Sequence, residues 1–231
     1  MTPPTRTVAV ALSADALLHQ WARQSAAPAG AAVVAHTEIA ARRRGGIEWR
    51  SPNAVAVSVL ARPVTLASTS AEVSWLAASL AAARALDGYL GGHRSCLWPD
   101  ALFHEAGDAI DVAVTASCTL GPGRVEYAAL TIRVGPVDLP DRRAMLTQAL
   151  LQQLRTYGPG LDEPSVVVDS YKADCATLGH AVEVRLLPHG SRRGLAEDVD
   201  ESGRLVLSSP TGLRELIAVA EVSSVELLPS A

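Results

Sequence analysis

Lysine is almost missing from this 231-residue chain, which carries nineteen arginines and a single lysine, Lys172. Aromatic residues are also few. One Phe, four Tyr and four Trp mean that a hydrophobic core has to be built mainly from Ala, Val and Leu. An excess of positive charge is absent as well, because the formal net charge is -4. This balance gives no bulk electrostatic basis for binding nucleic acid, so we expect no nucleic-acid partner.

Cysteines and long apolar runs are equally scarce. Cys96, Cys118 and Cys175 are widely spaced and lack the CxxC or Cys/His spacing of a metal site, which argues against a disulfide framework or a zinc centre. The apolar run at residues 8–12 is too short for a signal peptide, and no stretch approaches the ~20 apolar residues of a membrane span. We therefore expect reduced thiols in a cytoplasmic protein with no membrane partner and no bound metal.

The patterning predicts helices and strands in mixed order, followed by strands alone. Helices are predicted at residues 13–24, where Ser13 can cap the first turn, and at residues 71–87 and 141–157. Strands are predicted at residues 31–35, 55–60, 110–119 and 125–134, the last two joined by Gly121-Pro-Gly123 as a hairpin. After a Gly- and Pro-rich break, short strands are predicted at residues 182–187, 193–198, 204–208 and 219–227.

The break at residues 158–164, Gly-Pro-Gly-Leu-Asp-Glu-Pro, is the best candidate for a domain boundary. We predict an α+β domain over residues 1–160, with a mixed sheet and flanking helices. A small β-barrel domain is predicted over residues 168–231.

Several short motifs follow one another in a characteristic order. A basic loop, Ala41-Arg-Arg-Arg-Gly-Gly46, precedes Trp49-Arg-Ser-Pro-Asn-Ala and a strand that ends in Arg62-Pro63; Leu97-Trp-Pro-Asp-Ala-Leu102 comes after the second helix. These segments resemble the Gly-Arg-Gly-Arg-x-Gly-Arg-x-Trp, Trp-x-Ser-Pro-x-Gly and Lys-Trp-Pro-Asn-Asp-Leu motifs of the biotin protein ligase (biotin/lipoate A/B protein ligase) family.

The resemblance extends to the tail, where residues 177–179 and 194–205 are similar to the family's C-terminal SH3-like β-barrel. It spans most of the chain in the expected order and leaves no room for the N-terminal DNA-binding domain of the repressor-type ligases. The resemblance implies a biotin/lipoate ligase-like catalytic-type domain. It also implies biotin and ATP with Mg as cofactors, and a biotin carrier domain or a small carboxylic acid as partner.

Members of that family activate biotin as biotinyl-adenylate and then transfer it to a lysine of a carrier protein. Both steps place negative charge on phosphate oxygens, which fixed cations and backbone N–H groups have to stabilise. This chain departs from the family's motifs at several positions. Leu97 replaces the Lys and Asp100 replaces an Asn, while Ala41 and Arg43 replace two Gly residues. Glu38 replaces a Gln, and Arg133 replaces the Asn of a Gly-Ile-Gly-Ile-Asn strand. An apolar side chain cannot donate to a phosphate, and an added carboxylate repels one.

Seven residues are candidates for a ligand pocket: Ser13, Arg42, Arg44, Trp49, Ser51, Trp98 and Asp100. Each has a plainer interpretation. The arginines can be a solvated basic loop, and the tryptophans can be core residues. No catalytic residue is assigned, because His36, His93, His104 and His180 have no Ser or Asp partner at an informative spacing, and Asp108 and Asp111 sit at a predicted strand start.

Three functions remain open from the sequence. The first is a binding or interaction protein with the ligase fold that has lost ATP-dependent adenylation. The second is an active ligase for biotin or another carboxylic acid, in which Arg94 or Arg44 replaces the missing lysine. The third is an α/β domain unrelated to the ligases.

Overall fold

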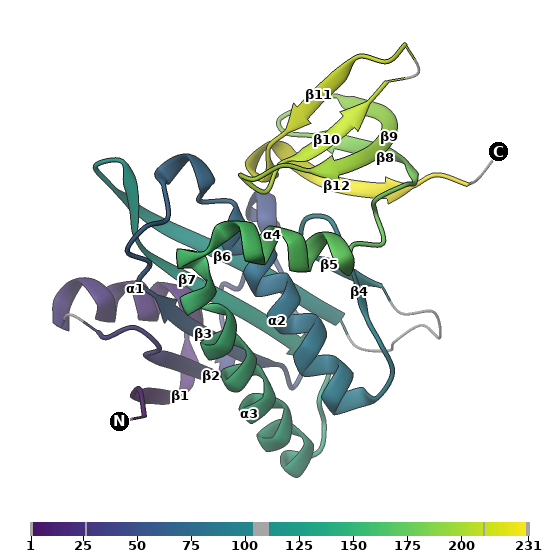
Figure 1. Ribbon diagram of the computed structural model, residues 1–231. Coiled ribbons are helices and arrows are strands. Elements are labelled where there is room, and N and C mark those ends of the chain that lie inside the picture. Colours follow the sequence, from purple (N-terminus) through teal and green to yellow (C-terminus); the bar gives the residue numbers. More distant parts are fainter. Residues whose placement is uncertain (1, 26, 104–110, 210, 230–231) are drawn as a thin grey trace.

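The computed structural model describes residues 2–25, 27–103, 111–209 and 211–229 (Figure 1). Its larger part is built on a five-stranded mixed sheet in the order β1-β2-β3-β7-β6. The strands are β1 (Thr5–Ala11), β2 (Ala32–Glu38), β3 (Val55–Ala61), β7 (Arg124–Gly135) and β6 (Asp111–Gly121). β1 and β2 are parallel, whereas the other neighbours are antiparallel.

Helices cover both faces of this sheet. α1 (Ala14–Ser25) packs on one face, and α2 (Val73–Leu90) and α3 (Pro140–Tyr157) pack on the other. The alternation of β2 accounts for the two cores, because Val33 and Ala35 face α1 while Ala32 and Val34 face the opposite side. α2 packs closely because more than half of its residues are Ala or Leu, and two thirds of its residues are buried.

The chain then passes through η3 (Pro159–Asp162) and α4 (Pro164–Ala173) to a second five-stranded sheet, which lies beyond α4 in Figure 1. We call it the C-terminal sheet; it is antiparallel, in the order β11-β10-β9-β8-β12. Its strands are β8 (Ala181–Leu186), β9 (Ser191–Val199), β10 (Leu205–Ser208), β11 (Arg214–Ile217) and β12 (Val222–Leu227). The predicted α+β fold, a mixed sheet with flanking helices followed by a small β domain, is confirmed.

Specific contacts join the two sheets. Between them lies a short hairpin of β4 (Ser95–Leu97) and β5 (Ala101–Phe103). The buried Trp98, at the turn of this hairpin, donates its indole N–H to the Gly203 carbonyl at 3.0 Å, and its backbone N–H to Thr177 Oγ1 at 2.8 Å. One continuous hydrophobic core runs from α2 and α3 into the C-terminal sheet.

The helices and long strands lie close to their predicted positions, but five elements were not predicted: β1, β4, β5, α4 and β11. The predicted strand at residues 219–227 begins with a turn of 3₁₀ helix, η4 (Val219–Glu221), before β12. The domain boundary at residues 158–164 stays a prediction. Among the described residues, no helix is both long and apolar enough to span a membrane. His104 and Asp108 lie outside the described residues.

Candidate functional site

The basic segment predicted from the sequence forms a tight loop between β2 and β3. We call residues 42–46 the arginine loop. Backbone bonds close its base, because Arg43 N–H donates to the Ile47 carbonyl at 2.7 Å and Trp49 N–H to the Ala41 carbonyl at 2.9 Å. Gly45 has a φ of 70°, a left-handed conformation that a side chain would strain. The loop is therefore a defined turn that presents its arginines in different directions.

Arg44 points inward and is almost enclosed. Its Nε and Nη2 donate to the two carboxylate oxygens of Asp100, each at 3.0 Å, and its Nη1 donates to the Val222 carbonyl at the start of β12. The side chains of Arg44 and Asp100 are only 9% and 14% exposed. All three guanidinium nitrogens of Arg44 are thus already used by the chain itself.

The neighbouring arginines are also paired. Arg43 contacts the Asp111 carboxylate, which accepts the indole N–H of Trp49 at 2.7 Å as well. Arg50 forms an exposed pair with Glu48 at 2.7 Å. Arg42 is exposed and donates to the Gly46 carbonyl at 2.6 Å, within the loop.

These residues surround a cavity of about 480 Å³, which we call the loop cavity. Its walls come from the arginine loop, the β4–β5 hairpin, the start of β6 and strand β12, so the main sheet and the C-terminal sheet both contribute. The lining residues are Arg43, Arg44, Ile47, Glu48, Trp49, Arg50, Leu97, Trp98, Asp100, Ala101, 111–114 and 223–225. Of the described residues, three arginines and three carboxylates line it, and each of these charges is paired with another residue of the lining.

Asp100 therefore has a different electrostatic role from the one expected from sequence. Alone, its carboxylate would repel an anionic ligand. In the structure the charge of Asp100 is balanced by Arg44, so that the pair brings no net charge to the cavity. Leu97 lines the same cavity and offers no donor beside Asp100.

A second cavity of about 480 Å³ lies on the other side of Trp49 and Arg50, which line both spaces. It is lined by residues 35–39, Ala41, 49–54 and Ala56, including the candidate Ser51. Trp49 is 4% exposed and belongs to the lining of both cavities.

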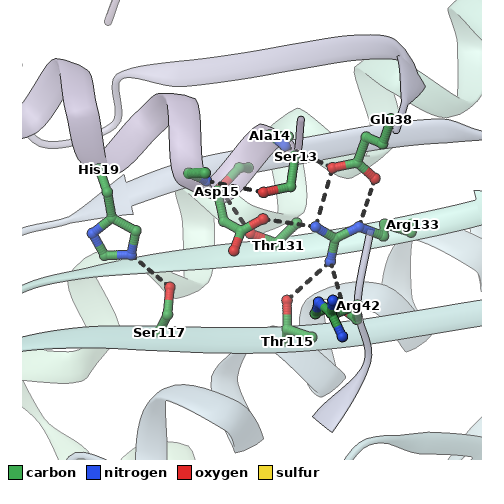
Figure 2. A network of polar contacts seen from close by, with 12 residues as sticks. Ser13, Ala14, Asp15, His19, Glu38, Arg42, Thr115, Ser117, Thr131 and Arg133 are labelled. Atoms are coloured by element: carbon green, nitrogen blue, oxygen red, sulfur yellow. Dashed lines mark hydrogen bonds and ion pairs between the residues drawn. The ribbon is translucent and has the colours of Figure 1, made fainter. Parts of the chain in front are cut away.

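A buried polar network lies beneath α1, close to the arginine loop (Figure 2). Arg133 of β7, 1% exposed, donates to Glu38 at 2.6 and 3.1 Å and to Asp15 at 2.7 Å. The remaining nitrogen of Arg133, Nη1, donates to Thr115 Oγ1 at 3.2 Å and to the Arg42 carbonyl at 3.4 Å. Arg133 thus ties α1, β2, β6 and the base of the arginine loop together.

Two carboxylates share this one buried cation. Burial is the largest single influence and lowers the pKa of Arg133, but the hydrogen bonds and charges of Glu38 and Asp15 outweigh it and raise that pKa overall. Glu38 also accepts the Ala14 N–H at 2.6 Å, at the positive N-terminal end of α1. Ser13, a predicted pocket residue, caps the same helix by accepting the Ala16 N–H at 3.4 Å.

One ion pair of this network explains why two positions can differ from the ligase motifs. Glu38 stands where the motif has Gln, and Arg133 stands where it has Asn; in the fold they are ion-pair partners. Glu38 without Arg133 would bury a carboxylate with no cation beside it, and Arg133 without Glu38 would keep only Asp15 as its ion-pair partner, whereas the two together are compatible with the core.

A Ser–His contact at the edge of the network does not form a catalytic triad. His19 Nε2 lies 2.6 Å from Ser117 Oγ, and Asp15 is one helical turn away. However, the Asp15 carboxylate is directed at Arg133, as Figure 2 shows. Burial lowers the pKa of His19, which favours the neutral ring.

The structure thus brings Arg44, Trp49, Trp98 and Asp100 to the loop cavity and Ser51 to the second cavity, while Ser13 belongs to the α1 network. Arg42 lies outside both cavity linings, though its carbonyl joins the network. Arg94, the other candidate to replace lysine, is buried at the C-terminal end of α2, where it donates to the Leu86 and Gly91 carbonyls at 3.2 and 3.0 Å. Sequence reasoning did not single out Asp15, Asp111 or Val222 as site residues.

Comparisons with known proteins give a family match for the C-terminal part of the chain and fold matches for nearly all of it. Residues 177–224 match the family model of the biotin protein ligase C-terminal domain. No curated protein has a significantly similar sequence. Several solved structures share the fold over nearly the whole chain.

A biotin protein ligase from Aquifex aeolicus, in complex with biotin and ATP, superposes with a TM-score of 0.71 at 16% identity, covering 97% of this chain and 99% of that one. A biotin protein ligase-like protein of unknown function from Silicibacter sp. TM1040 gives 0.65 at 13% identity, with 95% of each chain covered. The Leishmania major biotin protein ligase with biotinyl-5-AMP gives 0.59 at 18% identity, covering 94% of this chain and all of that one.

Proposed function

We propose that this chain, which has the fold of the biotin protein ligases, is a binding or interaction protein that does not form an acyl-adenylate. The observation that carries the proposal is that each arginine described in the lining of the loop cavity is paired with a carboxylate of the same lining. It is joined by Leu97, an apolar residue at the position where the ligase motif has its lysine.

Adenylate formation makes specific electrostatic demands. A carboxylate attacks the α-phosphorus of ATP, and pyrophosphate leaves with additional negative charge. Cations and N–H donors have to be directed at those oxygens before the reaction begins. Arg44 is the most enclosed of the three paired arginines, and each of its three guanidinium nitrogens donates to Asp100 or Val222.

The residues present do not suit ATP with Mg²⁺ at this site. The described carboxylates of the lining, Glu48, Asp100 and Asp111, already accept hydrogen bonds from arginine or tryptophan donors. We therefore assign no step that uses the nucleotide or the metal.

The space that remains suits a small ligand. A cavity of about 480 Å³ with an aromatic wall falls within the size range of small-molecule sites. The resemblance suggests a small carboxylic acid or a carrier domain as partner. Because the cavity arginines are already paired with carboxylates, we favour the carrier domain, docked over the cavity mouth. The three free thiols, Cys96, Cys118 and Cys175, agree with a cytoplasmic location for such a protein.

Two measurements test the proposal. The first is exchange of labelled pyrophosphate into ATP in the presence of biotin or lipoate, with a known ligase as positive control; we expect no exchange above background. Exchange at ordinary ligase rates would refute the loss of adenylation and favour an arginine in the role of the lysine.

The second measurement is a calorimetric binding screen with biotin, lipoate, ATP and a non-hydrolysable biotinyl-adenylate analogue. We expect weak or no binding of the two nucleotides. For a ligand that binds, the Arg42→Ala/Arg44→Ala variant decides whether the arginine loop contributes, since an unchanged affinity would mean that it does not.

A further inference from the structure

The loop cavity contains a carboxylate in the position that a bound anion would take. The two oxygens of Asp100 face Nε and Nη2 of Arg44 in a side-on, two-point arrangement at 3.0 Å each. This is the geometry in which a guanidinium recognises the carboxylate or phosphate of a ligand. Because the pair is largely shielded from water, its attraction is screened much less than that of a surface pair.

The third contact of Arg44 extends this arrangement to the C-terminal sheet. Its Nη1 donates to the Val222 carbonyl, and the lining of the cavity continues along residues 223–225 of β12. Gly45, next in the chain, packs so closely that a methyl group added there would lie 3.3 Å from Leu187 Cδ1. The arginine loop is therefore fixed between the β4–β5 hairpin and the C-terminal sheet.

We infer that Asp100 is a built-in competitor for anions: its carboxylate occupies the guanidinium of Arg44 and closes the loop cavity to small carboxylates and phosphates. The ligand class that remains for the native cavity is uncharged. This inference rests on the proposed function, because it explains how a cavity that retains arginines has no cation to offer.

The other arginine–carboxylate pairs of the cavity do not fulfil this role. The side chains of Arg43 and Asp111 are 38% and 46% exposed, and those of Arg50 and Glu48 are 80% and 53% exposed. Water and salt weaken such pairs, so freeing either arginine creates a weak anion site at most. The Arg43–Asp111 pair provides a matched control, because the same Asp→Asn substitution can be made there in an exposed pair.

The test is phosphate binding by four purified full-length proteins: wild type, Asp100→Asn, Asp111→Asn, and Asp100→Asn/Arg44→Met. Inorganic phosphate is titrated into each by calorimetry at low salt. We expect no measurable binding to wild type and saturable binding to Asp100→Asn, with an affinity at least roughly tenfold above that of Asp111→Asn. The double variant should lose the gain, because the guanidinium that holds the phosphate is gone.

Three outcomes would overturn the inference: no binding by folded Asp100→Asn, equal binding by Asp111→Asn, or binding that persists in the double variant. Thermal unfolding reports whether each variant is folded. If Asp100→Asn fails to fold, the wild type still decides. The NMR signal of the Arg44 Nε–H should not move on addition of phosphate, and a saturable shift would refute the inference.

These results are separable from the proposed function. Pyrophosphate exchange by the wild type would remove the proposed function whatever Asp100→Asn binds. A failure of Asp100→Asn to gain phosphate removes only the role given to Asp100.

Discussion

Arg133 is the residue whose loss should harm the fold most, and Arg133→Gln is the variant that shows it. The substitution shortens the side chain and removes the charge that Glu38 and Asp15 share. Glu38, whose side chain is 4% exposed, would keep only the Ala14 N–H as a donor. Asp15 is 28% exposed and can recover part of its hydration.

The expected cost follows from this difference in burial. Removing one member of a buried ion pair typically costs about 3–5 kcal/mol, because the remaining charge is left in the core. Most of the cost here should come from Glu38. For a chain of this size the melting temperature should fall by roughly 10 °C. Urea unfolding followed by circular dichroism near neutral pH measures the change in free energy.

Two controls make the result specific. Arg192→Gln breaks the pair with Glu215, whose two side chains are 48% and 43% exposed, and should cost less than about 1 kcal/mol. The double variant Glu38→Gln/Arg133→Gln removes both charges and should recover much of the lost stability. If Arg133→Gln costs no more than the Arg192 control, the network does not hold the core as we infer.

Three further predictions concern a close backbone approach, a buried histidine and the junction of the two sheets. Gly135→Ala should lower the free energy of unfolding by about 1–3 kcal/mol, because the new methyl group would collide with Ser51. Gly88→Ala, in open space on α2, should instead raise it by up to about 1 kcal/mol. Equal effects of the two substitutions in chemical denaturation would contradict this prediction. Burial lowers the pKa of His19, so the folded chain takes up that proton less readily than the unfolded one. Stability should therefore fall as pH drops below about 6.5 through the folded-state pKa, and His19→Gln should flatten this part of the profile; identical slopes would argue against it. Glu72→Gln weakens two backbone N–H contacts from η4, the turn before β12, at 3.0 and 3.3 Å. It should raise hydrogen exchange in η4 and β12; unchanged protection would mean that the other contacts suffice.

Sequence patterning located the elements that have strong periodicity or clear punctuation. The Ala-rich helix and the hairpin around Gly121 are local signals, and both elements appear in the fold. β1 was not predicted because its residues are mostly exposed on a sheet edge, so that its alternation marks no buried face. α4 was not predicted because it is short and begins at a proline that reads as part of a linker.

The site was predictable in its parts but not in its pairing. The motifs indicated Arg44, Trp49 and Asp100 as one region, and the cavity unites them. That Asp100 neutralises Arg44 is not visible in the sequence, because 56 residues separate the two partners. Arg133 gave a clear signal, a charged residue within a buried strand. Its partners come from other elements: the sheet register brings Glu38 within reach, and the packing of α1 on the sheet brings Asp15.

The core that the two sheets share bears on how such a chain can be recombined. A protein whose terminal domain hangs on a linker can exchange that domain by a single crossover. Here a donor sheet would also have to supply a carbonyl for the Trp98 indole, an acceptor for its backbone N–H and a carbonyl for Arg44. A graft that lacks them leaves buried donors without acceptors, each costing about 1–3 kcal/mol. We therefore expect the two halves to be inherited together. Chimaeras that join halves of distant relatives at residues 158–164 should fold poorly unless the contacts between the two halves are transferred as well.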